Sequence, residues 1–292
     1  MIREEGYMFW AELREEEFDK AVEMTGGLCV VPIGCFEMHG EHLPVSTDVI
    51  QAEAFAEEAA KLEPACIFPA FRFGDVAGLV DWKGGVRLDP ELILRLLENL
   101  CDEIARNGFK KIMFVNYHGG NVALLDYFVR SCMYKKRDYI VTWKKGYDGT
   151  SPKTIGKQLI EEGRGIYPEL LPEDEDVLID LVVNNKPDGH GGVDETSAVM
   201  VIRPDLVNMD REHVVSGYST KKADELSKAK IHSGFFWNVN YPNSYHGHAV
   251  GSSERIGKLL MRLRAEDLAK AYRVLKEDVN ATAWYEEHSK YY

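Results

Sequence analysis

The sequence predicts an α/β fold with a mostly parallel sheet that is covered by helices on both faces. Short apolar runs alternate with helical patterns over the first half of the 292 residues, and this alternation is typical of such sheets. Two of the apolar runs end in polar clusters that contain histidine. Because ligands of parallel sheets bind at the carboxyl ends of the strands, these clusters indicate a functional site.

The predicted elements follow one another in a regular order. Apolar runs predict strands at residues 28–34, 65–71, 111–115 and 139–143. Helical patterns predict helices at residues 48–62, 90–108, 122–135 and 194–201. Asp89 is a suitable N-cap for the second helix, with Pro90 at its first position. A long final helix is expected after a cap at Ser252 or Ser253.

We expect residues 1–292 to form a single domain. The strand–helix pattern breaks at about 144–188, where glycines, prolines and acidic residues separate short apolar pieces. A segment this long inside a domain is usually functional, and this one is too short to bury a core of its own. We interpret it as an excursion from the domain, either a lid or an arm for oligomer contacts.

Charge and apolar content exclude several classes of protein. The 48 acidic and 35 basic residues give a net charge of −13, which argues against nucleic-acid binding because phosphate contacts need clustered lysine and arginine. The sequence shows neither a signal-peptide pattern nor an apolar run long enough to cross a bilayer. The expectation is a cytoplasmic protein with no membrane partner. The five cysteines form no C-x-x-C pair, so neither a disulfide framework nor a thiolate metal site is predicted.

The first polar cluster follows the apolar run at 28–34. It contains two histidines and three carboxylates: Glu37, His39, Glu41, His42 and Asp48. Imidazole and carboxylate groups are natural ligands for Zn²⁺, Mn²⁺ and Fe²⁺. In an extended segment Glu37 and His39 point the same way and could share a pocket with Asp48. A polar surface loop is the alternative for this segment alone. Nearby Cys35 is interpreted as a small buried side chain rather than a nucleophile.

Two further clusters place a histidine beside paired glycines. His118 precedes Gly119 and Gly120 just after the predicted strand at 111–115, and His190 precedes a second Gly-Gly pair. Paired glycines allow the backbone to approach a ligand closely. One such motif is a weak indication, but two of them together with the first cluster form a specific constellation.

These motifs resemble those of the creatininase (creatinine amidohydrolase) family. The family pattern is Pro-x-Gly-x-x-Glu-x-His-Gly-x-His-x-Pro followed by Thr-Asp, then Asn-Gly-His-Gly-Gly-Asn, then His-x-Gly-x-x-Glu-Thr-Ser. The matching positions occur in the same order: Pro32, Gly34, Glu37, His39, Gly40, His42, Pro44, Thr47 and Asp48; Asn116, His118, Gly119, Gly120 and Asn121; His190, Gly192, Glu195, Thr196 and Ser197. The resemblance implies a three-layer α/β/α sandwich, a two-metal hydrolase and a homo-oligomer, often a hexamer.

Matched residue by residue, the resemblance implies a set of metal ligands. Asp48 would bridge two divalent ions, either Zn²⁺ or Mn²⁺, with Fe²⁺ as a third option. Glu37 and His118 would bind one ion, and His39 and Glu195 the other. Two ions bridged in this way can hold a hydroxide for attack on a substrate carbonyl.

The resemblance also implies roles around the ligands. His190 would be the general acid that protonates the leaving group. Glu41 and His42 would orient ligands, although purely local hydrogen bonding is an equal alternative. The polar loop at 238–251 contains His246 and His248, which either line the site or lie on the surface; His248 is the candidate for substrate binding.

The chain departs from the family pattern at three places. Tyr117 replaces the usual glycine before the histidine of the second motif, and Gly120 stands where creatininase itself has glutamate, so Glu195 is the substitute ligand. Trp82 lies in a segment that borders the substrate in relatives and has a different sequence here. Tyr117 and Trp82 are therefore candidate substrate-binding residues, and the differences argue against creatinine as the substrate.

The expected activity is hydrolysis of a small cyclic amide or a related C–N bond. An alternative within the family is hydrolytic C–C ring opening of a keto-inositol, which the polar loop and Tyr117 would suit. A third alternative, from another class, is a metal-binding protein that has lost catalysis. In the first two cases the partner is a small-molecule substrate.

Overall fold

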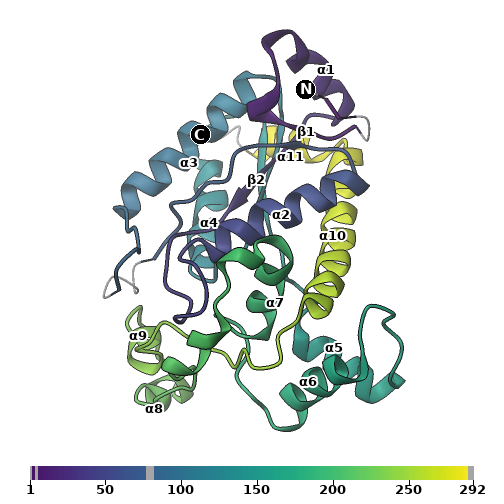
Figure 1. The fold of residues 1–292 in the computed structure, drawn as a ribbon. Helices are drawn as coiled ribbons and strands as arrows, with labels where there is room; N and C mark the ends of the chain where they lie inside the picture. The colour runs from purple at the N-terminus through teal and green to yellow at the C-terminus, as the bar shows by residue number, and fades with distance from the viewer. Residues whose placement is uncertain (1, 4–5, 77–81, 289–292) are drawn as a thin grey trace.

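The computed structural model describes residues 2–3, 6–76 and 82–288 and contains a central parallel sheet (Figure 1). The strand order is β1-β3-β2-β4-β5, and every pair is parallel. The strands are β1 (Met8–Phe9), β2 (Leu28–Ile33), β3 (Cys66–Ile67), β4 (Lys111–Asn116) and β5 (Ile140–Lys145). The predicted α/β fold with a parallel sheet is confirmed.

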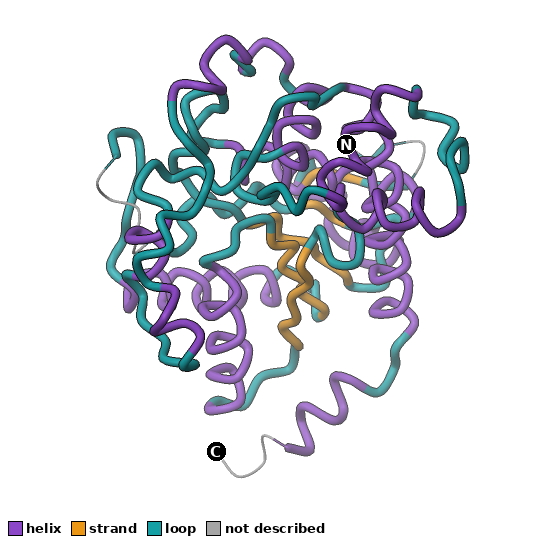
Figure 2. The backbone as a smooth tube through the Cα atoms, turned by 90° about the horizontal axis from the view of Figure 1, so that it is seen from below, coloured by secondary structure: helices purple, strands orange, loops and turns teal. Residues whose placement is uncertain are grey.

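Helices cover both faces of the sheet. One face packs against α1 (Phe18–Met24), α3 (Pro90–Arg106) and α4 (Asn121–Ser131). The other face packs against α2 (Thr47–Leu62), α7 (Val193–Ile202) and α10 (Glu254–Glu277). Figure 2 shows the strands at the centre with helices around them. The result is the expected α/β/α arrangement of layers.

The central strand β2 shows how the sequence builds these two cores. Its side chains alternate between the faces, as the period of a strand requires. Cys29 and Val31 belong to the core with α3 and α4, whereas Leu28 and Val30 belong to the core with α2 and α10. All six residues of β2 are buried, which explains why its sequence is continuously apolar.

Two predicted elements are shorter in the structure. The strand expected at 65–71 is regular only at Cys66–Ile67, because Pro69 has no N–H to donate and interrupts the ladder. Phe68 and Phe71 still donate hydrogen bonds to the carbonyls of β2. The helix expected at 122–135 ends at Ser131 and continues as a 3-10 turn, Cys132–Tyr134.

The segment at 144–188 is more regular than expected. It contains α5 (Pro152–Glu162) and α6 (Pro172–Val183), which pack against each other beside α7 and α10 (Figure 1). Ser151 caps α5 through its hydroxyl, and Pro152 occupies the first turn. Leu159 and Leu178 lie in a small core that α7 and α10 complete. The segment therefore buries apolar surface by sharing a core, which its length alone did not indicate.

The remaining helices are α8 (Asp224–Lys228), α9 (Phe236–Asn240) and α11 (Ala281–His288), with 3-10 turns at Trp10–Glu12, Glu15–Glu17, Pro204–Leu206 and Met209–Val214. Ser253 caps α10, as expected. None of the helices in the described part of the chain has the length and apolar character needed to span a membrane.

Candidate functional site

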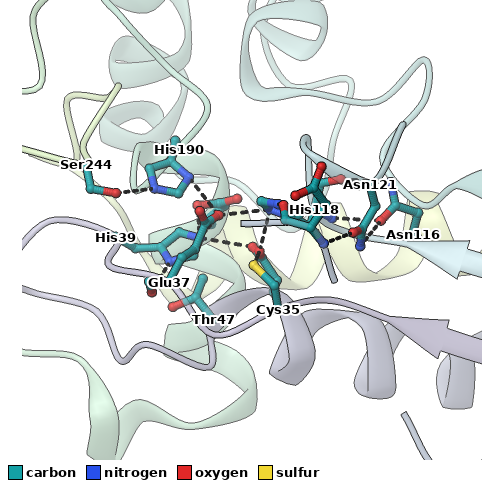
Figure 3. Close-up of polar contacts among 12 residues, drawn as sticks. Cys35, Glu37, His39, Thr47, Asn116, His118, Asn121, His190 and Ser244 are labelled. Carbon is teal, nitrogen blue, oxygen red and sulfur yellow. Dashed lines mark hydrogen bonds and ion pairs between the residues drawn. The ribbon is translucent and has the colours of Figure 1, made fainter. Parts of the chain in front are cut away.

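The carboxyl ends of β2 and β4 bring the three sequence motifs together (Figure 3). Glu37 and His39 lie in the segment after β2, and His118 follows β4. Asp48 lies in the first turn of α2. A Cβ atom at Gly34 would approach the backbone nitrogen of Val49 to 2.7 Å. Glycine at this position therefore lets the start of α2 pack directly against the end of β2.

Asp48 is the centre of the cluster because each of its oxygens faces a different histidine. Its Oδ1 lies 2.9 Å from His39 Nε2, and its Oδ2 lies 3.0 Å from His118 Nδ1. Glu37 Oε1 is 2.9 Å from His118 Nδ1, and Glu195 Oε2 is 3.5 Å from His39 Nε2. The five residues predicted as ligands thus form two groups that share one carboxylate.

Backbone carbonyls orient both imidazoles toward these carboxylates. His118 Nε2 is 2.7 Å from the Asp75 carbonyl, and His39 Nδ1 is 3.2 Å from the Glu37 carbonyl. Since a carbonyl only accepts, these two nitrogens carry the hydrogens. The other nitrogen of each ring then presents its lone pair to carboxylate oxygens when the ring is neutral. Either a proton or a metal ion must lie between such atoms, so the residues present fit a cation at each position.

The charges of the cluster also favour cations. Burial lowers the pKa of His39, but the carboxylates of Asp48 and Glu195 outweigh it and raise that pKa to about 10. Burial opposes the charged form of Asp48, but His39 and His118 hold its pKa well below the usual value. One oxygen of Glu37, Oε2, is buried without a hydrogen-bond partner among the described residues. Three carboxylates around two imidazoles leave this buried cluster able to bind positive charge.

His190 lies directly beside these groups. Its ring stacks on that of His39 at a centroid distance of 4.0 Å, and its Nδ1 is 3.6 Å from Glu37 Oε1. Its Nε2 is 2.8 Å from the Met38 carbonyl, which also accepts a hydrogen bond from the Ser244 hydroxyl. Burial and the positive charge of His39 lower the pKa of His190 to about 4. The neutral ring therefore donates through Nε2 and presents an unprotonated Nδ1 to the cluster.

Several neighbouring side chains hold the ligands in place. The Cys35 thiol donates to Asp48 Oδ2 at 3.1 Å, and burial raises the pKa of this thiol well above its usual value. Asn116 Oδ1 accepts hydrogen bonds from the His118 amide and from the Asn121 side chain. Cys35, which the sequence indicated only as a small buried residue, thus contacts the shared carboxylate.

His42 and Glu41 connect motifs but do not reach the cluster. His42 Nε2 is 2.9 Å from the Gly191 carbonyl and 3.1 Å from the Thr196 hydroxyl. Glu41 forms an ion pair with Arg211. His42 therefore links the segment after β2 to the start of α7, where Glu195 lies.

A cavity of about 600 Å³ opens beside the cluster. Of the predicted substrate-binding residues, Tyr117 lines it, whereas Trp82 and His248 are not among its described lining residues. His246 lines the cavity instead of His248, whose Nε2 lies 3.3 Å from Lys186 Nζ, just after α6. The Trp82 side chain is half-buried.

Other lining residues had no sequence signal. They come from four separate segments and include Gln51, Tyr147, Ser151, Lys153, Trp237 and Arg264. Each is isolated in the sequence and belongs to no motif. Only their position relative to the sheet could have identified them.

A buried histidine–carboxylate cluster beside a cavity, at the carboxyl ends of parallel strands, defines the class of α/β enzymes whose substrates bind at this edge of the sheet. The family model described as creatinine amidohydrolase matches residues 11–272. The chain belongs to the creatininase family and is a hydrolase.

Individual relatives agree with this assignment. The chain is 26% identical over 214 residues to creatinine amidohydrolase of Pseudomonas putida, covering 70% of this chain and 75% of the relative. It is 32% identical over 120 residues to the mycofactocin precursor peptide peptidase of Mycolicibacterium smegmatis, covering 38% and 47%. Solved structures share the fold: a creatinine amidohydrolase (creatininase) superposes with a TM-score of 0.66 at 20% identity, covering 93% and 98%. A creatininase structure described as the Mn form gives 0.66 at 21% identity, covering 93% and 100%.

Proposed function

We propose that this protein is a two-metal hydrolase of small amides. Asp48 would bridge two divalent ions, with Glu37 and His118 on one and His39 and Glu195 on the other. The observation that carries the proposal is the shared carboxylate, each oxygen of which faces the free nitrogen of an oriented imidazole. Zn²⁺ and Mn²⁺ are the preferred ions for this donor set, and related creatininase structures are described as Zn and Mn forms.

The chain supplies the groups that such chemistry needs. When bound, two divalent ions would activate water and polarise the substrate carbonyl. The Cys35 thiol and the carbonyls of Asp75 and Glu37 would fix the orientation of the ligands. His190 would accept a proton at Nδ1 and pass it to the leaving nitrogen, while its Nε2 stays fixed on the Met38 carbonyl.

We favour an amide as the substrate. The relatives named above are an amidohydrolase and a peptidase, and both names describe cleavage of a C–N bond. Ring opening of a keto-inositol finds no support among these relatives. The homo-oligomer, a hexamer by family resemblance, remains a prediction that analytical ultracentrifugation can test.

Metal analysis combined with an activity screen tests the proposed function. We expect the purified protein to contain two equivalents of metal and to hydrolyse one or more small amides but no oxidised inositol. A chelator should abolish turnover, and Zn²⁺ or Mn²⁺ should restore it. Full activity in metal-free protein would refute the two-metal mechanism, and metal without turnover of any substrate would favour a non-catalytic role.

A further inference from the structure

The wall of the cavity beside His190 and α2 contains nitrogen donors that have no acceptor among the described residues; the Trp237 ring lies 5.5 Å from that of His190. Gln51 is only 1% exposed, and its Nε2 has no hydrogen-bond partner in the described structure. Trp237 Nε1 is also buried without a described partner. Both residues line the cavity. Since a buried donor without an acceptor is costly, both groups indicate that a ligand with acceptor atoms belongs in this space.

Lys153 adds a positive charge to the same cavity. It lies in the first turn of α5, next to the cap residue Ser151, which also lines the cavity. Within the described ranges its ammonium group has no carboxylate partner within 4.0 Å. Burial lowers the pKa of His246, and the charge of Lys153 lowers it further. Lys153 is therefore near His246, which stands beside Trp237 at a ring distance of 5.9 Å.

The second cation of the wall is already neutralised. Arg264 donates to Asp194 Oδ2 at 2.7 Å and to the Thr150 carbonyl at 2.9 Å, and it is 1% exposed. Asp188 and Asp194 also line the cavity. These two acids would repel a dianion such as a phosphate ester more strongly than a monoanion. Burial and Asp194 raise the pKa of Asp188, and the charge of Lys153 opposes this rise, so Lys153 is near Asp188. Among the described lining residues Lys153 is nevertheless the cation with no carboxylate within 4.0 Å, and it suits a single negative charge.

We propose that the cavity binds an amide substrate that carries a carboxylate, held by Lys153 together with the N–H donors of Gln51 and Trp237. This inference rests on the proposed amide hydrolysis and adds the substrate class. Lys153 would act as a specificity-determining residue that contacts the substrate away from the bond that breaks. The segment at 144–188 would thereby take part in substrate selection through the first turn of α5.

A matched pair of cyclic amides tests this proposal. The two compounds, 5-oxoproline and 5-oxoprolinamide, differ only in a carboxylate and a neutral carboxamide. Binding to the metal-loaded protein is measured by isothermal titration calorimetry, and hydrolysis is followed in parallel. We expect the wild-type protein to favour the acid by about 10- to 100-fold, the range for a hydrogen bond to a charged group. Lys153→Met should reduce this ratio to about one, and Lys153→Arg should retain most of it.

Lys157→Met is the matched control, because Lys157 lies one turn further along α5 and is exposed. It removes the same charge from the same helix outside the cavity and should leave the ratio unchanged. The proposal is overturned if the wild type does not favour the acid, if neither compound binds, or if Lys153→Met leaves the ratio intact. Failure to hydrolyse either compound would count against the proposed function, whereas the binding ratio would still decide the role of Lys153.

Discussion

Replacement of Asp48 by asparagine tests the arrangement on which the proposed function depends. Both oxygens of this carboxylate face a histidine, at 2.9 and 3.0 Å, so both proposed ions would lose the same ligand. Asparagine keeps the size of the side chain but offers one carbonyl oxygen and no charge. We expect metal content, measured by inductively coupled plasma mass spectrometry, to fall from two equivalents to nearly none.

The loss of metal should also appear in thermal stability. A ligand that binds only the folded state at 100 times its Kd stabilises that state by about 2.7 kcal/mol. Two ions would contribute about 5 kcal/mol, which for a chain of this size raises Tm by roughly 10 °C. Addition of Zn²⁺ or Mn²⁺ to metal-free protein should produce this shift in the wild type. Asp48→Asn should show almost none of it.

Glu53→Gln provides the control for this experiment. Glu53 lies on the same helix, α2, and its side chain is 41% exposed. The substitution also removes one negative charge, but at a position outside the cluster. Two equivalents of metal and the full shift in Tm should therefore remain. Two equivalents of metal in Asp48→Asn would show that Asp48 does not bridge, whatever the activity of the variant.

Further predictions concern single positions. Glu195→Gln should weaken one ion only, so metal titration should show one site of unchanged and one of reduced affinity; equal loss of both would contradict the grouping. His190→Ala should keep two equivalents of metal while kcat falls by about 10²–10⁴-fold, the usual contribution of a general acid, and least for a substrate whose leaving group needs no proton. If His190→Ala instead loses one metal ion, His190 is a metal ligand. Burial opposes the charged form of Asp174, but hydrogen bonds from Arg255 and Ser253 lower its pKa below 3.8. Its stabilising effect is therefore present above about pH 4 and lost below it. Asp174→Asn should lower the urea midpoint at pH 6 and progressively less toward pH 3; a constant difference across this range would contradict the reasoning.

The spacing of apolar residues in the sequence predicted those helices and strands whose buried side chains recur at regular intervals. The helix α3 was predicted within two residues of its end because Asp89, Pro90 and its apolar stripe agree. The strand at 65–71 was overestimated because apolar composition does not show that Pro69 interrupts the ladder. The helices α5 and α6 were missed because glycines, prolines and acidic residues interrupt the pattern at 144–188, and because their apolar residues complete a core only with α7 and α10.

Some residues of the candidate site could likewise be predicted from the sequence, whereas others could not. Glu37, His39 and Asp48 occur within twelve residues, so their convergence could be inferred from the end of a strand and the start of a helix. The position of His246 rather than His248 in the cavity could not be inferred, because it depends on tertiary contacts such as that of His248 with Lys186. Lys153 looks like any lysine on a helix, and only the position of α5 brings it to the cavity.

The proposed metal ligands and the proposed substrate-selecting lysine lie on different elements of the fold. The proposed ligands come from the ends of β2 and β4 and the starts of α2 and α7, whereas Lys153 comes from α5, in the segment at 144–188. A change at Lys153 can therefore alter which amide binds without moving a metal ligand. Lys153→Met should accordingly retain two equivalents of metal while its preference for an acidic substrate disappears. The charge that selects the substrate would then come from a different part of the fold than the metal ligands, although Gln51, a donor to the same carboxylate, shares α2 with Asp48.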